Sequence, residues 1–422
     1  MSAPTRRTFL KTTAAGAAAF AAPAVQARGA NERLTVGLIG AGNRGRSIAA
    51  EVMKLGHRVA ALADIAEFRL DAAVAAIGKK VAAEAKVEDP WESGEPKFYA
   101  DYRPLLERKD LDAVIVATPD HHHKDMLVAA MQAEKHVYVE KPLTKSIDEG
   151  NEMIEAVRRA GKVVQVGNQR HSGPHWAEAA RAVQARSFGQ LVWAKVWDCR
   201  NWLKRDPFAP PKDFKYDAEK LDWKAFLGSA PKRPFDALRY WSWRWYWDYA
   251  GGLMTDIGAH QLDIVQWLGG ADVPKSAVAN GGVYHFKKWE TPDVVHGVWD
   301  YGKYTATFAV EFINGADGVG AAFYGTRQTL LCDARPKGLG IRLYDTTDPI
   351  TPDLKPVQSW PVVDETPLHV QNWVECIKTG DEPNSPIELG HRVILAAHLA
   401  NLSYRTGKKI FWDADRNEVI GS

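Results

Sequence analysis

The sequence predicts an α/β protein with a doubly wound N-terminal domain, followed by a C-terminal α+β domain whose open sheet is mostly antiparallel. Two observations predict the first domain. Short apolar segments alternate with helical ones from residue 34 to residue 168, and a glycine-rich turn stands directly behind the first of them. A third observation predicts the second domain, because longer β-rich segments joined by Gly and Pro turns begin near residue 169.

The N-terminal domain is expected to contain five strands. Each segment is rich in Val, Ile, Leu or Ala and apolar throughout, which is typical of parallel strands covered on both faces. The expected strands are 34–39, 58–63, 113–117, 136–139 and 163–166. Helices are expected between them at 46–55, 67–77, 123–133 and 147–160.

The C-terminal domain has a different pattern, in which β-rich segments dominate and helices interrupt them. The expected strands are 191–200, 276–284, 294–310, 318–324 and 328–332. Helices are expected at 254–268 and 391–406. This mixture indicates an α+β domain and not a second doubly wound one.

Composition sets limits on function. The 422 residues are 45% apolar and 25% charged with a formal charge of +2, which is ordinary for a globular enzyme of two domains. This balance does not favour nucleic-acid binding or attachment to an anionic membrane. The cysteines Cys199, Cys332 and Cys376 lie far apart and form no C-x-x-C pair, so neither a disulfide framework nor a metal cluster is expected.

The N-terminal residues have the features expected of an export signal. Thr5-Arg6-Arg7-Thr8-Phe9-Leu10-Lys11 precedes an alanine-rich apolar run that ends at Val25-Gln26-Ala27. The run is shorter than the roughly 20 residues that span a bilayer, so no stable membrane anchor is expected. We expect residues 1–27 to be a twin-arginine signal peptide that sends the folded protein to the periplasm, ahead of domains at 34–168 and 169–422.

The turn Gly40-Ala41-Gly42-Asn43-Arg44-Gly45 follows the first expected strand and opens an expected helix. Glycines there permit a tight turn and close approach of backbone to a pyrophosphate, whose charge the helix N-terminus favours. Asp64 ends the next strand, where a carboxylate accepts hydrogen bonds from ribose hydroxyls and repels a 2′-phosphate. These features predict a Rossmann dinucleotide-binding domain that prefers NAD, with NADP as the alternative because Arg44 and Arg46 stand nearby.

Three further motifs follow in order along the chain. They are Thr118-Pro119-Asp120, Glu140-Lys141-Pro142, and Gly251-Gly252 leading into Asp256-Ile257-Gly258-Ala259-His260. With the glycine turn they resemble the glucose–fructose oxidoreductase / inositol dehydrogenase / MocA (Gfo/Idh/MocA) family over residues 34–412. The resemblance implies a nicotinamide-binding Rossmann domain, a second domain whose open sheet supports substrate binding and oligomer contacts, and chemistry on sugars or cyclitols.

The resemblance implies three catalytic residues, Lys141, Asp256 and His260, and a cis peptide before Pro142. The chemistry independently needs such groups. Oxidising a secondary alcohol requires a base for the hydroxyl proton, and His260 titrates in the right range for it. Asp256 lies one helical turn before His260 and projects from the same face. Lys141 would bind the reacting oxygen at the end of its strand.

The cofactor is expected to contact residues that follow the five expected strands: Gly40, Gly42, Asn43, Arg44, Gly45, Asp64, Thr118, Pro119, His123, Glu140, Lys141 and Gln169. In this arrangement Asp120 is expected to cap the helix at 123–133. The run His121-His122-His123 is not expected to bind metal, since it follows a segment that passes the cofactor.

Substrate contacts are expected from Asp256 and His260 together with polar and aromatic residues around them. Arg170 and His171 follow the strand at 163–166, where family members place polar groups near the substrate. Tyr246 and Trp247 belong to an aromatic run at 240–249, and Trp197 offers another pocket wall. Aromatic faces stack on pyranose rings, so a glycoside is favoured, although most of these aromatics are expected to pack as core.

These features together favour a periplasmic NAD(P)-dependent oxidoreductase that acts on a sugar or glycoside hydroxyl by hydride transfer and retains its cofactor. The alternative is an NAD-dependent glycoside-cleaving enzyme that works through a transient 3-keto sugar, elimination, water addition and re-reduction. The expected partner is a small carbohydrate, without nucleic acid, and the family's open sheet predicts a homodimer or homotetramer.

Overall fold

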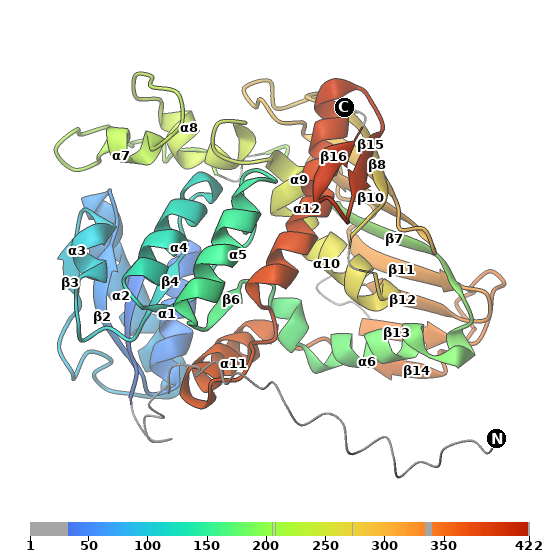
Figure 1. Cartoon of the computed structure of the whole chain (residues 1–422), viewed down its shortest axis with the longest axis horizontal. Helices are drawn as coiled ribbons and strands as arrows, with labels where there is room; N and C mark the ends of the chain where they lie inside the picture. The colour runs from blue at the N-terminus through green and yellow to red at the C-terminus, as the bar shows by residue number, and fades with distance from the viewer. Residues whose placement is uncertain (1–32, 205, 207, 272, 334–339, 421–422) are drawn as a thin grey trace, which may run out of the picture.

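The structure is a computed structural model that describes residues 33–204, 206, 208–271, 273–333 and 340–420. The predicted signal peptide at 1–27 lies outside these residues. Within the described residues, no helix is long and apolar enough to cross a membrane. Two sheets organise the chain, and Figure 1 shows the N-terminal sheet and its helices on one side and the larger C-terminal sheet on the other.

The N-terminal domain is built on a six-stranded parallel sheet with the order β3-β2-β1-β4-β5-β6. Its strands are β1 (Thr35–Ile39), β2 (Arg58–Ala63), β3 (Lys97–Tyr99), β4 (Ala113–Val116), β5 (His136–Val139) and β6 (Val164–Val166). Its helices are α1 (Asn43–Lys54), α2 (Glu67–Ala85), α3 (Tyr102–Leu106), α4 (His123–Gln132) and α5 (Glu149–Ala160), with a 3-10 turn η1 (Asp120–His122) before α4. The predicted Rossmann fold is therefore confirmed, and ligands of this fold bind at the carboxyl edge where the strand order reverses.

Two elements of this domain were missed by the sequence prediction, β3 and α3. The β3 strand has only three residues, pairs with β2 at the sheet edge and leaves its side chains exposed or half-exposed. It therefore lacks the apolar run by which the other strands were recognised.

The C-terminal domain is built on a ten-stranded sheet with the order β14-β13-β12-β11-β7-β10-β9-β8-β15-β16. Its strands are β7 (Leu191–Cys199), β8 (Ser276–Gly282), β9 (Val294–Asp300), β10 (Thr305–Glu311), β11 (Val319–Gly325), β12 (Thr329–Asp333), β13 (Gly340–Tyr344), β14 (Gln358–Trp360), β15 (Ile410–Asp413) and β16 (Glu418–Ile420). Neighbours are antiparallel except β7 and β10, so the predicted class is confirmed. The segment 294–310 is two strands, because the chain reverses at Gly302, where φ is +77°.

Helices cover one face of this sheet and connect it to the Rossmann domain. They are α6 (Pro174–Gln184), α9 (Gly252–Asp256), α10 (Gly258–Gly269), α11 (Glu365–Thr379) and α12 (Ile387–Thr406). The expected helix at 254–268 is thus divided between α9 and α10. The unpredicted α11 packs against α1, where Val370, Trp373 and Val374 join the core formed by the N-terminal sheet. The Rossmann core is therefore completed by residues from the far end of the chain.

The described residues between positions 201 and 250 (201–204, 206 and 208–250) form a long excursion from the C-terminal domain, which we call the strap. It contains α7 (Trp223–Leu227), α8 (Ala237–Trp241) and the 3-10 turn η4 (Trp243–Trp245). Figure 1 shows α7 and α8 above one end of the Rossmann domain. Backbone bonds fix this position, since Asp222 N donates to Ile65 O at 3.0 Å and Glu67 N donates to Lys220 O at 2.9 Å. The strap therefore joins the segment just after β2, next to the carboxyl edge of the sheet.

Candidate active site

A large pocket lies between the carboxyl edge of the Rossmann sheet, the α9–α10 helices and the strap. Its volume is about 1110 Å³, at the upper end of the range for small-molecule and cofactor sites. It is lined by Gly40, Gly42, Asn43, Arg44, Asp64, Thr118, Pro119, Glu140, Lys141 and Gln169 of the predicted cofactor set, and by Asp256 and His260. The pocket thus brings most of the predicted residues together, from five strand ends and one helix pair.

The glycine turn has the geometry that a dinucleotide site requires. Gly40 has a φ of +92°, and a Cβ there would lie 2.6 Å from the carbonyl oxygen of Ala117. A Cβ on Gly45 would lie 2.2 Å from Gly40 O, so this glycine lets α1 pack closely on the turn. Gly42 faces the pocket and has only the end of an arginine side chain near its Cβ position. The N-terminus of α1 is therefore open to a pyrophosphate, which the residues present fit.

Asp64 lies at the end of β2 and lines the same pocket. Its carboxylate accepts from Ala41 N at 2.8 Å and from Ala66 N at 3.0 Å, which ties the glycine turn to the start of α2. Each oxygen keeps a further lone pair for a ribose hydroxyl. Of the two cations that sequence placed nearby, Arg46 donates to Ala41 O at 2.7 Å and does not line the pocket. Arg69, which the prediction missed, does line it.

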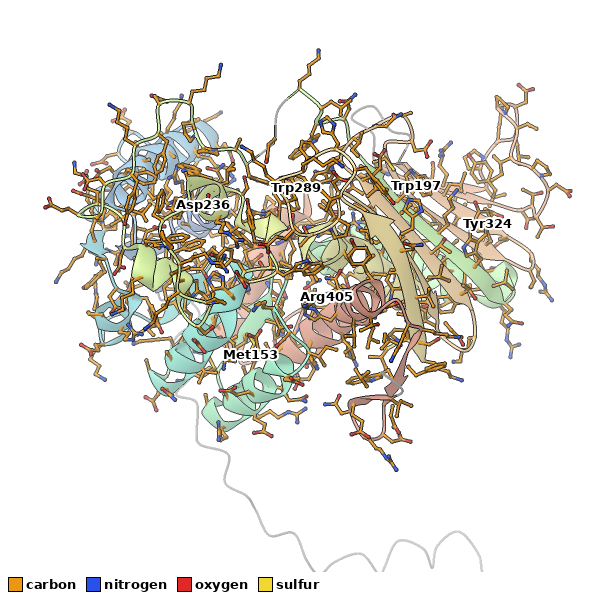
Figure 2. The ribbon with its side chains drawn as sticks, turned by 90° about the horizontal axis from the view of Figure 1, so that it is seen from above. Met153, Trp197, Asp236, Trp289, Tyr324 and Arg405 are labelled. Carbon is orange, nitrogen blue, oxygen red and sulfur yellow. The ribbon has the colours of Figure 1, made fainter. Side chains whose placement is uncertain are left out.

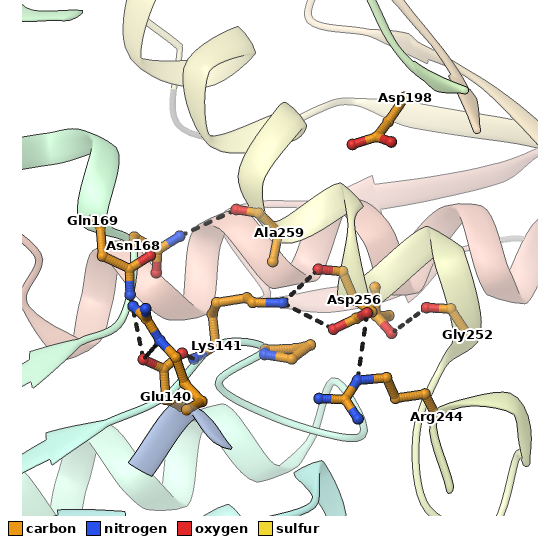
Figure 3. A network of polar contacts seen from close by, with 12 residues as sticks. Glu140, Lys141, Asn168, Gln169, Asp198, Arg244, Gly252, Asp256 and Ala259 are labelled. Atoms are coloured by element: carbon orange, nitrogen blue, oxygen red, sulfur yellow. Dashed lines mark hydrogen bonds and ion pairs between the residues drawn. The ribbon is translucent and has the colours of Figure 1, made fainter. Parts of the chain in front are cut away.

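Glu140 lines the pocket and joins the segments that follow three strands, and Figure 3 shows it beside Gln169. Arg44 Nε donates to Glu140 Oε1 at 2.7 Å, and Gln169 Nε2 donates to the same oxygen at 3.3 Å. Gln169 also donates to the Tyr138 hydroxyl at 3.1 Å. A Cβ on Gly167 would lie 2.9 Å from this carboxylate, so only glycine fits there. The network fixes the loop that carries Lys141.

Lys141 and Asp256 form the centre of the site. The Lys141 ammonium donates to Asp256 Oδ1 and to Asp256 O, both at 2.8 Å (Figure 3). Arg244 Nε lies 3.6 Å from the other carboxylate oxygen. Burial would raise the pKa of Asp256, but the charges of Lys141 and Arg244 outweigh burial and hold that pKa far below its usual range. The Lys141–Pro142 peptide is cis.

His260 faces the pocket from α10, one turn after Asp256. Burial, then the positive charges of Lys141 and Arg170, lowers its pKa well below the ordinary value for histidine. The sequence expectation that this imidazole titrates near neutrality is therefore wrong. The imidazole is neutral at physiological pH and able to accept a proton, although as a weaker base than an exposed histidine.

Asp120 is a pocket residue whose role the sequence did not reveal. It was expected to cap the helix at 123–133, but its side chain makes no capping bond. It is 2% exposed, lines the pocket, and its Oδ1 has no hydrogen-bond partner among the described residues. Burial, then the negative charge of Asp256, raises its pKa well above the usual value. The site therefore holds a second carboxyl group, which ionises less readily than an exposed one.

The histidine run is used for hydrogen bonding between loops. His121 Nε2 and His122 Nε2 both contact Phe226 O of the strap, at 2.8 and 2.9 Å. His123 contacts Pro142 O at 2.8 Å and Thr118 O at 2.9 Å, and it does not line the pocket. The structure thus gives His123 a role in joining the loops after β4 and β5, and not the predicted cofactor contact. No group of three metal-ligating side chains occurs among the described residues.

Two predicted substrate ligands, Arg170 and His171, hold the catalytic helix from outside the pocket. Arg170 donates to His260 O at 2.7 Å. His171 Nε2 lies 2.6 Å from Asp263 Oδ1, and its ring stacks on Trp267 with centroids 4.2 Å apart. Neither residue lines the pocket, because the short turn η2 (Gln169–Ser172) directs both toward α10. Both therefore contact the helix that carries His260, and their predicted contact with a substrate stays a prediction.

The three predicted aromatic contacts also lie outside the pocket. Trp197 is on the open face of the ten-stranded sheet, since its neighbours Val196 and Asp198 point to the covered, buried face; Figure 2 shows it on the sheet, away from the Rossmann half. Tyr246 is buried beneath the guanidinium of Arg239. Trp247 donates to Glu290 O at 3.0 Å on the outer side of the strap.

Other aromatic residues take their place. The strap lines the pocket with Phe208, Phe226, Tyr240, Trp241 and Trp243. Two of them, Trp241 and Trp243, flank Ser242 in the run that the sequence singled out. The chain changes from the α-helix α8 to the 3-10 turn η4 at Ser242, and this change sets the direction of both side chains. The Trp-rich sequence has no periodicity that would have indicated it.

One pocket holds Lys141, Asp256 and His260 beside the glycine turn of a six-stranded Rossmann sheet. This combination is typical of a nicotinamide-dependent oxidoreductase. Comparison with family models agrees. Residues 34–168 match the oxidoreductase family with an NAD-binding Rossmann fold, and residues 183–422 match the C-terminal α/β domain of the same family. The chain belongs to the Gfo/Idh/MocA oxidoreductase family.

Curated relatives include the scyllo-inositol 2-dehydrogenase (NAD(+)) of Bacillus subtilis, 30% identical over 43% of this chain and 42% of that protein. The levoglucosan dehydrogenase of Pseudarthrobacter phenanthrenivorans is 26% identical over 57% of this chain and 52% of that one. The match thus spans about half the length of these two relatives. An uncharacterised oxidoreductase of B. subtilis, YrbE, is 25% identical over 70% of each chain.

Among solved structures, the WlbA dehydrogenase of Bordetella pertussis in complex with NADH and UDP-GlcNAcA has a TM-score of 0.66 at 18% identity, covering 91% of this chain and all of that one. A levoglucosan dehydrogenase in complex with NADH and levoglucosan has a TM-score of 0.63 at 19% identity, covering 90% and 99%. At these identities the likeness shows the shared two-domain fold.

Proposed function

We propose that this protein oxidises a CH–OH group of a sugar or glycoside by hydride transfer to NAD that it holds tightly. The single observation that carries the proposal is the meeting of Lys141, Asp256 and His260 in one pocket with the glycine turn. The curated relatives that are inositol and levoglucosan dehydrogenases support a polyol or sugar as the substrate class.

The residues divide the chemistry as follows. Lys141, held by Asp256 at 2.8 Å, is placed to donate to the reacting oxygen and stabilise negative charge on it. The neutral imidazole of His260 receives the hydroxyl proton. The nicotinamide, when bound, supplies the acceptor for the hydride. Arg170 and His171 keep the helix bearing His260 at a fixed distance from Lys141.

Tight retention of the cofactor is supported by the strap. Tyr240 and Trp241 line the pocket together with Asp64 and Arg69, and the Arg69 Nε donates to the Tyr240 hydroxyl at 2.8 Å. The Arg69 guanidinium also lies over the Trp241 ring, 4.9 Å from its centroid. A dinucleotide in this pocket would leave only after these contacts open, which favours slow release.

Mass spectrometry of the nucleotide released from the denatured, purified protein tests the proposal, followed by a sugar and glycoside panel with NADH absorbance as the readout. Stoichiometric NAD and reduction of that NAD by a sugar would support it. A protein that isolates free of nucleotide would contradict tight retention. Release of an aglycone without net NADH formation would instead identify the glycoside-cleaving route.

Export to the periplasm by the twin-arginine route is also proposed, from Arg6 and Arg7 and the apolar run behind them. Export of a folded enzyme accords with a cofactor that travels inside it. Fractionation of cells that express the full chain, compared with the Arg6→Lys/Arg7→Lys double variant, tests this. Equal periplasmic amounts of the two would contradict it.

A homodimer or homotetramer formed through the open face of the ten-stranded sheet is the third part of the proposal. Val278 and Val298 lie opposite each other on β8 and β9 and are exposed in the single chain, as is Trp193 on β7. A second copy of the sheet would cover this apolar face.

A further inference from the structure

Arg244 is an unassigned cation at the reaction centre. Its guanidinium lies between two aromatic rings of the strap, 4.2 Å from the centroid of Trp243 and 4.3 Å from that of Phe208. All three residues line the pocket with Asp256. A guanidinium stacked between rings is held rigidly in one plane, so its N–H groups are directed before any ligand arrives.

The donors of Arg244 are largely unused. Its one ion pair among the described residues joins Nε to Asp256 Oδ2 at 3.6 Å, beyond hydrogen-bond distance. For its terminal nitrogens there is no hydrogen bond within the described part of the chain. Other arginines of the strap differ, since Arg239 pairs with Asp248 and Glu290. A planar guanidinium with free donors in a pocket is suited to a planar, doubly accepting anion.

The charges of the site favour such an anion. Lys141 and Arg244 are two cations, one at each oxygen of the single carboxylate of Asp256. Burial, then the negative charge of Asp256, raises the pKa of Asp120, the other carboxyl group of the site, well above its usual value. Two cations therefore share one carboxylate, and neither makes an ion pair with another carboxylate among the described residues. A neutral sugar would leave Asp256 as their one counter-ion in a partly buried pocket.

We propose that Arg244 binds a carboxylate of the substrate, so that the enzyme acts on a sugar acid, such as a uronate, in preference to the neutral sugar of the same configuration. This inference rests on the proposed function and names the substrate class of that site. Lys141 lies at one oxygen of Asp256 and Arg244 near the other, so we expect one sugar ring to place its hydroxyl at Lys141 and its carboxylate at Arg244.

The test compares matched pairs with the full mature holoenzyme: methyl glucuronide against methyl glucoside, and methyl galacturonide against methyl galactoside. Two readouts are taken, calorimetric binding of each sugar and reduction of the resident NAD. The variants are Arg244→Gln, which removes the charge and fork, and Arg244→Lys, which keeps the charge alone. Lys232→Gln is the control, because Lys232 is an exposed strap cation that does not line the pocket.

The expected result is a preference for the acid of at least about tenfold in binding, as a charge-assisted hydrogen-bonded pair provides. Arg244→Gln should abolish this preference, Arg244→Lys should reduce it, and Lys232→Gln should leave it unchanged. Equal affinity of wild type for acid and neutral sugar would overturn the inference, and this comparison needs no variant to fold.

Three other outcomes decide between this inference and its alternatives. A loss of NAD from Arg244→Gln, with the sugar preference unchanged, would assign Arg244 to the cofactor and overturn the inference. A preference for glucose 6-phosphate over glucose without one for the uronates would also overturn it. If the acids bind selectively and no sugar reduces the resident NAD, the proposed oxidoreductase function fails while the binding site for a sugar carboxylate stands.

Discussion

The Lys141 ammonium donates to both the carboxylate and the backbone carbonyl of Asp256, at 2.8 Å each, although 115 positions separate the two residues in the sequence. Lys141 follows a strand of the Rossmann domain, and Asp256 ends a helix that packs on the other sheet. The centre of the site is thus a contact between domains. Its geometry depends on how the domains pack as well as on the two side chains.

Replacing Lys141 with Met should lower the turnover of the resident NAD by about 10²–10³-fold, the usual effect of losing one donor to a developing oxyanion. The nucleotide content should stay the same, because the glycine turn and Asp64 are unchanged. Single-turnover reduction of bound NAD by the substrate measures this. Lys79→Met is the matched control, since Lys79 is exposed on α2; undiminished turnover by Lys141→Met would show that this lysine has no catalytic role.

The sequence motifs predicted the meeting of Lys141 and Asp256 better than they predicted which residues surround this pair. Lys141, Asp256 and His260 were expected together because strand ends and one helical face bring motif residues to a common edge. Trp197 was misplaced because β7 has aromatic or apolar residues on both faces, so alternation could not show which face is covered. Arg170 and His171 were misplaced because their direction depends on a single 3-10 turn.

Asp120→Asn should remove a decrease in the free energy of unfolding that the wild type undergoes as pH rises. The pKa of Asp120 is raised in the folded state, so the unfolded chain ionises first as pH rises above about 4, and unfolding then becomes easier. The contribution of Asp120 to the free energy of unfolding is therefore fully favourable only at low pH, and it is lost as pH rises. The variant should gain relative stability between acid and neutral pH, which thermal melts of both proteins across that range measure.

An infrared band of a protonated carboxylic acid at neutral pH, present in wild type and absent from Asp120→Asn, would verify the ionisation state directly. Parallel melting curves for the two proteins at every pH would contradict the raised pKa. Asp101→Asn is the matched control, because Asp101 is an exposed carboxylate at the edge of the same pocket. This control should keep the infrared band of the wild type.

Tyr240→Phe should speed release of the nucleotide. The change removes the hydrogen bond from Arg69 to the strap and keeps the ring, so a loss of about 1 kcal/mol is expected, equivalent to roughly fivefold faster release. Nucleotide remaining after timed desalting measures the rate. Tyr216→Phe is the control, because Tyr216 is an exposed strap tyrosine. Equal retention by wild type and Tyr240→Phe would show that the strap does not limit release.

The strap shows why part of this site was beyond sequence reasoning. Its short elements, α7 and α8, have five residues each, and its position depends on single contacts such as the backbone bond from Asp222 to Ile65. Such contacts join segments that are far apart in sequence and leave no periodic signal. The same holds for α11, whose Trp373 packs edge-on against Tyr138 of β5, 5.6 Å between centroids.

Asp64→Ser should shift the cofactor preference toward NADP. The carboxylate repels a 2′-phosphate, while Arg69 lines the pocket nearby and would attract one. We expect the ratio of the NADP and NAD dissociation constants to change by about tenfold or more in favour of NADP. Calorimetric titration of nucleotide-stripped protein measures both constants. The Asp64→Ser/Arg69→Ala double variant should lose the gain, and an unchanged ratio in Asp64→Ser would show that another group sets the preference.

Val298→Glu should dissociate the proposed oligomer without unfolding the chain. Val298 is 46% exposed in the single chain, so a glutamate there is solvated in the monomer, whereas between two apolar sheet faces it would be a buried, unpaired charge. Its register partner Val278 would become part of the same unfavourable contact. Size-exclusion chromatography with light scattering should show a particle of smaller mass. A thermal melt in dilute solution should show a melting temperature that is unchanged or modestly lower. Val87→Glu, 41% exposed beyond the end of α2, should leave the mass of the wild type; an oligomer that survives Val298→Glu and dissociates in Val87→Glu would place the interface on the Rossmann domain.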